Sequence, residues 1–326
     1  NGLNGQVNAI VAYEDDLYVG GQFTATGDGS PTGLGNIARY DIINKTWHAL
    51  PEEGLNGDVA VLALIGDDLY VGGKFTATGD GSTTPLGYIA RYDITDNSWN
   101  VLKNDGLSGD SNAGVRALIV SGNDLYVGGR FNQSGDGNVT GLNYIARYNT
   151  TGIGNWYALA DNGLDNVVNA LAVSGNDLYV GGHSTKSFNG NVPNLNCIAR
   201  YDMSGGAWYA LKKQGLKSAV MALAISGSDL YAGGIITQIY DGSITNLGNI
   251  VHYDTDTESW SALDNDGLSF YVYTLAVSGG DLYVGGHFAS TGDGSVTGLN
   301  SIARYTINSG PWHKLPEDGL KWTVFT

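Results

Sequence analysis

A five-residue motif, Leu-Tyr-Val-Gly-Gly, recurs along the chain and restricts its fold more than any other feature. The copies begin at Leu17, Leu69, Leu125, Leu178, Leu230 (with Ala for Val) and Leu282. The intervals between them are 52, 56, 53, 52 and 52 residues. A tryptophan accompanies each copy, at Trp47, Trp99, Trp156, Trp208, Trp260 and Trp312. A period of this length indicates that one supersecondary unit is stacked repeatedly.

Each unit predicts four short β-strands. In the first copy, residues 7–12 form a nearly continuous apolar run, which is typical of a strand buried on both faces. Further strands are expected at 17–21, 37–40 and 46–50, with a long polar loop at 23–35. No segment has a convincing amphipathic helical pattern. We therefore predict an all-β fold, a six-bladed β-propeller with four antiparallel strands per blade.

We expect a single β-propeller domain over residues 1–326. The repeats are approximately 2–53, 54–105, 106–162, 163–214, 215–266 and 267–318, with a partial seventh copy at 319–326. The segment from Asp318 to Thr326 aligns with that from Asn1 to Ala9, so both would compete for one inner-strand position. We expect the N-terminal segment to supply the inner strand of the first blade. The alternatives are that the Trp322 segment pairs there, or that the natural chain continues.

Glycine is abundant, at 50 residues, and occupies fixed places in each unit. We expect the Gly-Gly pair to permit close approach of neighbouring strands and unusual φ angles near the propeller axis. The position of Ala9 holds small residues in every copy, whereas the position of Ile10 holds large ones. One face of the inner strand would then fit the crowded axis, and the other would fill the space between blades. Each tryptophan would lie on the outermost strand.

The spacing of Gly-Gly, a later Tyr and a Trp seven residues beyond it (eight in the third copy) resembles the kelch repeat family, which includes the galactose-oxidase-type propellers. It is still more similar to propeller repeats of bacterial secreted and surface proteins and of fungal cortical polarity-marker proteins. The resemblance covers the whole chain and implies the fold, but the stretch between Gly-Gly and Tyr is longer than in kelch. It does not fix a ligand.

The chain is acidic, with a net charge of −16 and a pI near 4.4. Such a surface repels nucleic acid and anionic lipid, and suits bound cations or neutral partners such as sugars. No run of 18 apolar residues is present, so we expect no membrane insertion. The single cysteine, Cys197, cannot form an intramolecular disulfide.

Two recurring acidic sets are candidates for structural or metal-binding roles. The first pairs an aspartate before each Leu-Tyr with an arginine on the third strand, and we interpret it as structural. Its members are Asp16, Asp68, Asp124, Asp177, Asp229 and Asp281, with Arg39, Arg91, Arg147, Arg200 and Arg304. The second lies in the long loops, at Asp28, Asp80, Asp136, Asp241 and Asp293. Asp-Gly followed by Ser or Asn favours a turn. Calcium ligation and direct sugar contact are the alternatives.

Positions at which the copies differ are more informative about function, because they are not needed to maintain the repeat. One follows Gly-Gly and another opens the inner strand, and both would surround the mouth of the central channel. We predict ligand contacts from Asn8, Gln22, Lys74, Arg116, Arg130, Asn169, His183, Tyr273 and His287. Solvated rim residues are the alternative interpretation.

The sixth copy adds an aromatic run, Phe270-Tyr271-Val272-Tyr273, where the first copy has Gly5-Gln6-Val7-Asn8. Exposed aromatic rings bind sugars and protein partners. Packing against the chain end near Trp322 is the equal alternative.

Catalytic signatures are missing from the sequence. There is no Gly-x-Ser-x-Gly elbow and no His or Cys cluster with metal-ligand spacing. We therefore expect a non-catalytic binding or scaffold module, extracellular or on the cell surface, that engages a glycan or a surface protein at the channel mouth. We expect no cofactor, and calcium is the alternative. An enzyme with its site at the channel mouth, a hydrolase or an oxidase, and a structural segment of a larger surface or filament protein are the alternatives.

Overall fold

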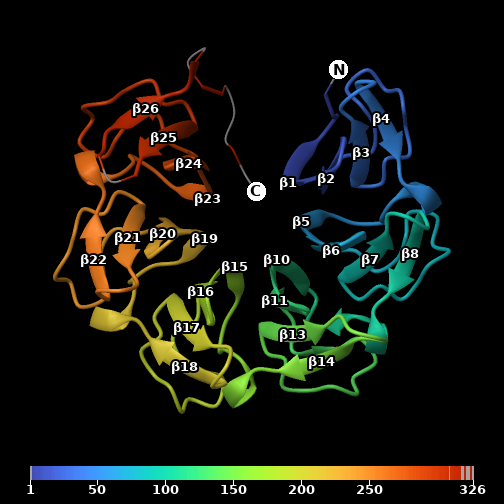
Figure 1. Cartoon of the computed structure of the whole chain (residues 1–326), viewed down its shortest axis with the longest axis horizontal. Helices are drawn as coiled ribbons and strands as arrows, with labels where there is room; N and C mark the ends of the chain where they lie inside the picture. The colour runs from blue at the N-terminus through green and yellow to red at the C-terminus, as the bar shows by residue number, and fades with distance from the viewer. Residues whose placement is uncertain (1, 308, 317–318, 321–323, 325–326) are drawn as a thin grey trace. The chain divides into compact units, whose positions relative to one another are not determined.

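The computed structural model describes residues 2–307, 309–316, 319–320 and 324. They form six four-stranded antiparallel sheets, the blades of an all-β propeller (Figure 1). The predicted fold class is thus confirmed. The chain divides into two compact units, Asn1–Gly163 and Leu164–Phe325, and each contains three blades. The prediction of a single domain stays a prediction.

In the first unit, blade one consists of β1 (Gln6–Tyr13), β2 (Asp16–Gln22), β3 (Ile37–Asp41) and β4 (Thr46–Ala49). Blade two consists of β5 (Val59–Ile65), β6 (Asp68–Gly73), β7 (Ile89–Asp93) and β8 (Ser98–Val101). Blade three consists of β10 (Gly114–Ser121), β11 (Asp124–Arg130), β13 (Ile145–Asn149) and β14 (Asn155–Ala158). An additional short ladder in this blade pairs β9 (Leu107–Ser108) with β12 (Gln133–Ser134).

In the second unit, blade four consists of β15 (Val168–Ser174), β16 (Asp177–Gly182), β17 (Ile198–Asp202) and β18 (Ala207–Ala210). Blade five consists of β19 (Val220–Ser226), β20 (Asp229–Gly234), β21 (Ile250–Asp254) and β22 (Ser259–Ala262). Blade six consists of β23 (Val272–Ser278), β24 (Asp281–Gly286), β25 (Ile302–Thr306) and β26 (Trp312–Lys314). Short 3₁₀ turns join the blades: η1 (Pro51–Glu53), η2 (Lys103–Asp105), η3 (Ala160–Asn162), η4 (Lys212–Gln214) and η5 (Asp264–Asp266).

The four strands of each blade pair in chain order, so the first strand is the inner one and the fourth is the outer one. β1 pairs with β2 along its length, which confirms that the N-terminal segment supplies the inner strand of blade one. The inner strands of consecutive blades contact one another within each unit, as β1 and β5 do. No helix in the described part of the chain is long and apolar enough to cross a membrane.

A β-bulge interrupts every inner strand opposite the Gly-Gly pair. In blade one, Val7 pairs with Gly21 and Ala9 with Gly20, so Asn8 is the extra residue. A Cβ at Gly21 would overlap the carbonyl oxygen of Gln6, and one at Gly20 would overlap Val59 of the next blade. The close approach of neighbouring backbone and side chains therefore explains why both positions are glycine. The expectation of unusual φ was wrong, because neither glycine has a positive φ.

The inner strand of blade one is less buried than the sequence predicts. Ile10 is 61% exposed, whereas its counterparts Leu62 and Leu118 pack against core clusters between neighbouring blades. Burial on both faces was therefore wrong for β1. An apolar run reports the average environment of a repeat, and blade one departs from that average.

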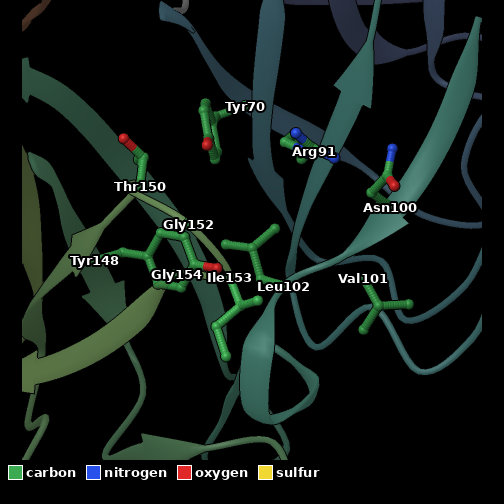
Figure 2. Close-up of a pocket in the computed structure, with 10 residues that line it drawn as sticks. All are labelled: Tyr70, Arg91, Asn100, Val101, Leu102, Tyr148, Thr150, Gly152, Ile153 and Gly154. Carbon is green, nitrogen blue, oxygen red and sulfur yellow. The ribbon is translucent and has the colours of Figure 1, made fainter. Parts of the chain in front are cut away.

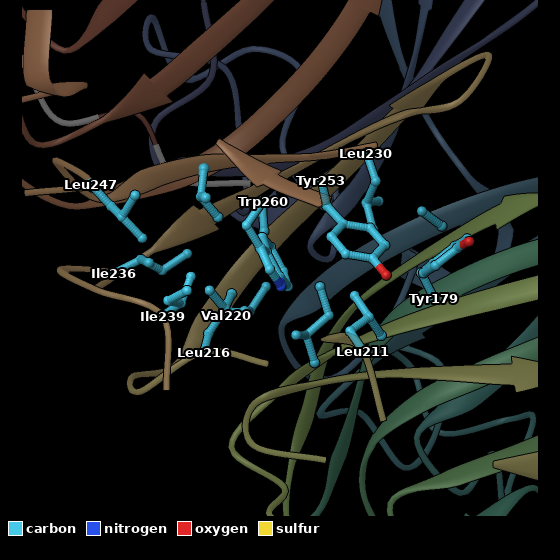
Figure 3. Packing of buried hydrophobic residues seen from close by; sticks show 14 residues of the cluster. Tyr179, Leu211, Leu216, Val220, Leu230, Ile236, Ile239, Leu247, Tyr253 and Trp260 are labelled. Atoms are coloured by element: carbon cyan, nitrogen blue, oxygen red, sulfur yellow. The ribbon is translucent and has the colours of Figure 1, made fainter. Parts of the chain in front are cut away.

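Tyrosine and tryptophan close the outer part of each blade core. Tyr253 and Trp260 lie side by side in blade five, with ring centroids 4.6 Å apart (Figure 3). The indole N–H of Trp260 donates to the backbone oxygen of Lys212, at 2.8 Å, in the turn before blade five. Trp99 makes the equivalent bond to Pro51, at 3.1 Å. The tryptophans thus lie on the outer strands, as predicted, and in blades two, three, five and six they bond the connection before the blade.

The described residues of the partial seventh copy repeat the contacts of the earlier copies. The Leu320 N–H donates to the Asn300 oxygen at 2.9 Å, as Leu55 does to Gly35 at 2.7 Å. A Cβ at Gly285 would lie 2.6 Å from Cγ1 of Val324, in the place that Val59 takes beside Gly20. Val324 therefore takes beside blade six the position that Val59 takes beside blade one. Trp322, whose pairing was the alternative, lies outside the described residues.

Candidate functional site

The variable positions gather at one end of every blade, which we call the loop end. Here the second strand enters the long loop, and the connection from the preceding blade enters the first strand. The bulge residue and the residue after Gly-Gly both lie at this end because Val7 pairs with Gly21 and Gln6 with Gln22. The same register recurs in blade six, where Val272 pairs with Gly286. The repeat therefore presents two variable side chains per blade at one end of the sheet.

In the first unit, three cations occupy these positions on blades two and three: Lys74, Arg116 and Arg130. Arg130 forms an ion pair with Asp110, with Nη2 2.6 Å and Nε 3.0 Å from Oδ2. Desolvation, and then the neighbouring charge of Arg130, lower the pKa of Arg116. Asp110 was missed from the sequence, although the 56-residue interval showed that the third copy carries extra residues there.

Three predicted ligand residues are engaged in contacts between blades. The Asn8 amide donates to the Val59 oxygen at 2.8 Å, and the Asn169 amide to the Val220 oxygen at 3.0 Å. The Gln22 amide donates to the Asp58 carboxylate at 3.0 Å. These side chains join neighbouring blades, so they serve the fold as well as any ligand.

In the second unit, the loop end of blade six is aromatic. The ring of Phe270 lies 4.1 Å from that of Tyr271 and 5.2 Å, edge-on, from that of His287. Tyr273 is the bulge residue, and its ring centroid is 6.4 Å from that of Tyr271. Phe270 is 44% exposed. His183 occupies the equivalent of the His287 position on blade four and is exposed.

A pocket of about 370 Å³ opens beside this aromatic group. Its lining includes the exposed Phe270 and His287, the buried Phe288, and Leu320 of the partial seventh copy. Ser269, Asn300 and Ser301 add hydroxyl and amide groups, and Ala289 completes the lining. No Asp, Glu, Lys or Arg is among the described residues that line it. This pocket lies directly at the predicted contact residue His287.

Each recurring Asp–Arg set forms an ion pair at the opposite part of the blade, between the second and third strands. The Arg39 to Asp16 distance is 3.0 Å, and the other four arginines lie 3.1 Å from their aspartates. In blade five, His252 replaces arginine and lies 2.7 Å from Asp229. One guanidinium nitrogen makes each contact. Partial exposure of both partners limits their stabilising effect.

The aspartates of the long loops accept hydrogen bonds from the loops themselves. Oδ1 of Asp80 accepts from Thr78 Oγ1 at 3.1 Å and from the Ser82 N–H at 2.9 Å. These bonds hold the pKa of the carboxyl below its usual range, with the Ser82 hydroxyl contributing most. Lowered pKa values recur at Asp28, Asp136, Asp241 and Asp293. The geometry is that of a turn closed by its aspartate, and calcium binding stays a prediction.

Two further pockets lie between blades, away from the loop ends. The one between blades two and three measures about 260 Å³ (Figure 2). Figure 2 shows Arg91 and Asn100 on one side of it, and Thr150 and Tyr148 on the other. Its counterpart between blades four and five measures about 410 Å³. There the Arg200 guanidinium lies 4.5 Å from the centre of the Tyr209 ring.

The described residues contain no group of three or more His, Cys, Asp and Glu side chains able to hold a metal ion. Cys197 is half-buried, and burial raises the pKa of its thiol to about 11. A thiol with such a pKa is protonated at neutral pH and is a poor nucleophile.

Family comparison relates this repeat to a known propeller. The model described as the Rax2 C-terminal beta propeller domain matches residues 1–101 and 89–266. The chain belongs to this family. A segment of 77 residues is 43% identical to the polarized growth protein rax2 of Schizosaccharomyces pombe. A segment of 87 residues is 37% identical to polarized growth protein L1 of a Phoma species.

These matched segments are small parts of long proteins. They cover 24% and 27% of this chain, but only 6% of either relative. The activities and partners of those whole proteins therefore do not transfer to this member of the Rax2 propeller family by similarity alone.

Solved structures agree on the fold alone, because their sequence identities to this Rax2 family member are low. The computationally designed Ika8 protein has a TM-score of 0.53 at 15% identity, over 99% of this chain and 91% of its own. The extracellular domain of a putative hybrid two-component system from B. thetaiotaomicron has a TM-score of 0.60 at 16% identity. That match covers 98% of this chain and 35% of the other.

Proposed function

We propose that the chain is a non-catalytic binding module of a cell-surface protein that takes part in polarised growth. Its ligand, a glycan or a surface protein, is engaged at the loop ends of the blades. Membership of the Rax2 propeller family supports the setting, since the matched relatives bear the name of polarized growth proteins.

The observation that supports binding at the loop ends is the contrast within each blade. Gly-Gly and the bulge keep one geometry in blades one and six, yet the side chains around them change completely. Asn8 and Gln22 in blade one correspond to Tyr273 and His287 in blade six. Positions that vary while the backbone stays constant are free to serve a partner, and the aromatic and cationic types found here are frequent in binding surfaces.

Chemistry also favours binding over catalysis. A catalytic site needs a nucleophile or a general base held within hydrogen-bond reach of its partner. The recurring carboxylates are engaged in ion pairs and turns, as at Asp68 and Asp80. The thiol of Cys197 has a raised pKa.

The test compares binding of the fluorescently labelled chain to intact fission-yeast cells before and after removal of loop-end side chains. The double variant Arg116→Ala and Tyr273→Ala removes one cation and one tyrosine there. The matched control, Lys45→Asn with Tyr209→Ala, removes the same types elsewhere on the blades. We expect the loop-end variant to lose at least about tenfold in affinity, and the control to bind as the unaltered chain does.

Absence of saturable binding by the unaltered chain would overturn the proposal. Equal losses in both variants would do so as well, because the loop ends would then have no special role. A purely structural segment predicts one of these two outcomes.

A further inference from the structure

We propose that the pocket at the loop end of blade six is a binding site for a neutral saccharide. This inference rests on the proposed function, because it names the ligand class for one part of the loop-end surface. Three observations carry it: where Phe270 stands in the repeat, how its ring is held, and which groups line the pocket beside it.

Phe270 occupies a position at which the repeat does not need an aromatic side chain. The equivalent residues are Gly5, Gly57, Gly109, Asn166 and Ser218. In blades one and two, even a Cβ at this position would approach the chain that follows Gly-Gly, at Phe23 and at Lys74. Phe270 is 44% exposed and is not part of the buried core cluster of blade six. Folding therefore does not account for the aromatic residue.

Neighbouring rings hold Phe270 in one orientation. Tyr271 lies 4.1 Å from it at an interplanar angle of 34°, and His287 lies 5.2 Å from it at 64°. The strands fix both neighbours, since Val272 pairs with Gly286 between them. A ring held in place while it remains exposed is suited to stacking, because little conformational freedom is lost on binding.

The pocket next to this ring offers polar groups without formal charge. Ser269, Asn300 and Ser301 contribute hydroxyl and amide groups, and none of its described lining residues is Asp, Glu, Lys or Arg. In a chain with a net charge of −16, a pocket whose described lining has no carboxylate and no lysine or arginine disfavours anionic ligands and offers a cationic one no carboxylate partner among those residues. Aromatic rings with a few hydroxyl and amide groups match a pyranose, which presents C–H faces and hydroxyls.

The volume indicates the size of the ligand. About 370 Å³ lies near the lower end of the range for small-molecule sites, roughly 300–1,000 Å³. One or two sugar rings fit such a space. The remainder of a longer neutral glycan would extend over the exposed loop end.

The test measures binding of laminaribiose, mannobiose and chitobiose by calorimetry and saturation-transfer NMR, with digalacturonate as the charged control. We expect at least one neutral disaccharide to bind, with saturation transfer to its C–H protons, and the charged one to bind at least about tenfold more weakly. Phe270→Gly, which restores the residue of blades one to three, should weaken binding at least about tenfold. Tyr209→Ala, which removes a comparably exposed ring elsewhere in the same unit, should leave it unchanged.

No neutral disaccharide binding with a Kd below about 10 mM would overturn the inference. Loss of binding in Tyr209→Ala together with retention in Phe270→Gly would also overturn it. A large fall in the Tm of Phe270→Gly without any disaccharide binding would assign the ring to packing against the chain end instead. The cell-binding test stays independent: if cells are bound but disaccharides are not, only this inference fails, whereas absence of cell binding removes the proposed function.

Discussion

The loop ends of blades one and six share a backbone and differ in chemistry. Asn8 and Gln22 in blade one donate to the neighbouring blade, at Val59 and at Asp58. In blade six the equivalent residues are Tyr273 and His287, which lie within an aromatic group beside a pocket. The register around the bulge is the same in both. The same backbone thus carries side chains that bond blade one to its neighbour and, in blade six, side chains that we assign to ligand binding.

The largest expected effect separates the framework of blade six from its loop-end surface. Phe288 follows His287 directly and is 4% exposed within a core cluster, as Phe23 is buried in blade one. Phe288→Ala should lower the free energy of unfolding by about 3–5 kcal/mol, because it leaves a cavity in the core. Chemical denaturation of the variant and of Phe270→Gly would measure the contrast. A similar loss of unfolding free energy in both variants would contradict the distinction between framework and surface.

The glycine pair should be equally sensitive in the two blades. A Cβ at Gly21 would overlap Gln6, and one at Gly286 would overlap Tyr271 and lie 3.1 Å from Phe288. Either Gly→Ala variant should cost about 1–3 kcal/mol, since the inner strand must shift. Gly27→Ala is the control, because its Cβ would meet only the Gly2 oxygen, at 3.4 Å. The Tm of each variant checks this prediction. An unchanged Tm in Gly286→Ala, with a lowered Tm in Gly21→Ala, would mean that the two backbones differ.

A smaller effect is expected from the outer strand of blade six. The indole N–H of Trp312 donates to the backbone oxygen of Asp264 at 2.9 Å. Trp312→Phe keeps most of the ring but leaves this carbonyl without that donor, which should cost about 1–2 kcal/mol. The variant should leave disaccharide binding unchanged at the loop end. Weakened binding with an unaltered Tm would show that the outer strand belongs to the site.

Much of the fold could be predicted from the sequence because each blade repeats the same constraints. The Gly-Gly pair, the third-strand Tyr and the outer-strand Trp locate three of the four strands within one or two residues, as β2 at Asp16–Gln22 shows. The bulge at Asn8 could not be predicted, since an extra residue in a short strand leaves no sign in the apolar pattern. The contacts of Asn8 and Asn169 with the next blade depend on side-chain direction, which spacing does not reveal.

The smallest effect concerns the loop carboxylates. We expect the pH dependence of stability that arises from the loop aspartate to be larger in blade six than in blade one. Asp293 accepts from Thr291, Ser295 and Asn265, whereas Asp28 accepts from Thr26 and Ser30. These bonds lower both pKa values in the folded chain, so protonation favours unfolding. The stabilisation is present above the unfolded pKa of about 3.9 and is lost as the pH falls through the lower folded value.

Asp293→Asn should therefore flatten the loss of Tm below about pH 4 more than Asp28→Asn does. A chelator should leave both Tm values unchanged if the loops are turns. A Tm that falls on chelation would instead favour calcium in these loops.

The most direct test of the account replaces the loop-end side chains of blade six with those of blade one. The variant carries Phe270→Gly, Tyr271→Gln, Tyr273→Asn and His287→Gln. We predict a Tm within about 2 °C of the unaltered chain, which corresponds to roughly 1 kcal/mol for a chain of this size, together with loss of saccharide binding. A collapse of the Tm with binding retained would contradict the separation of framework from function.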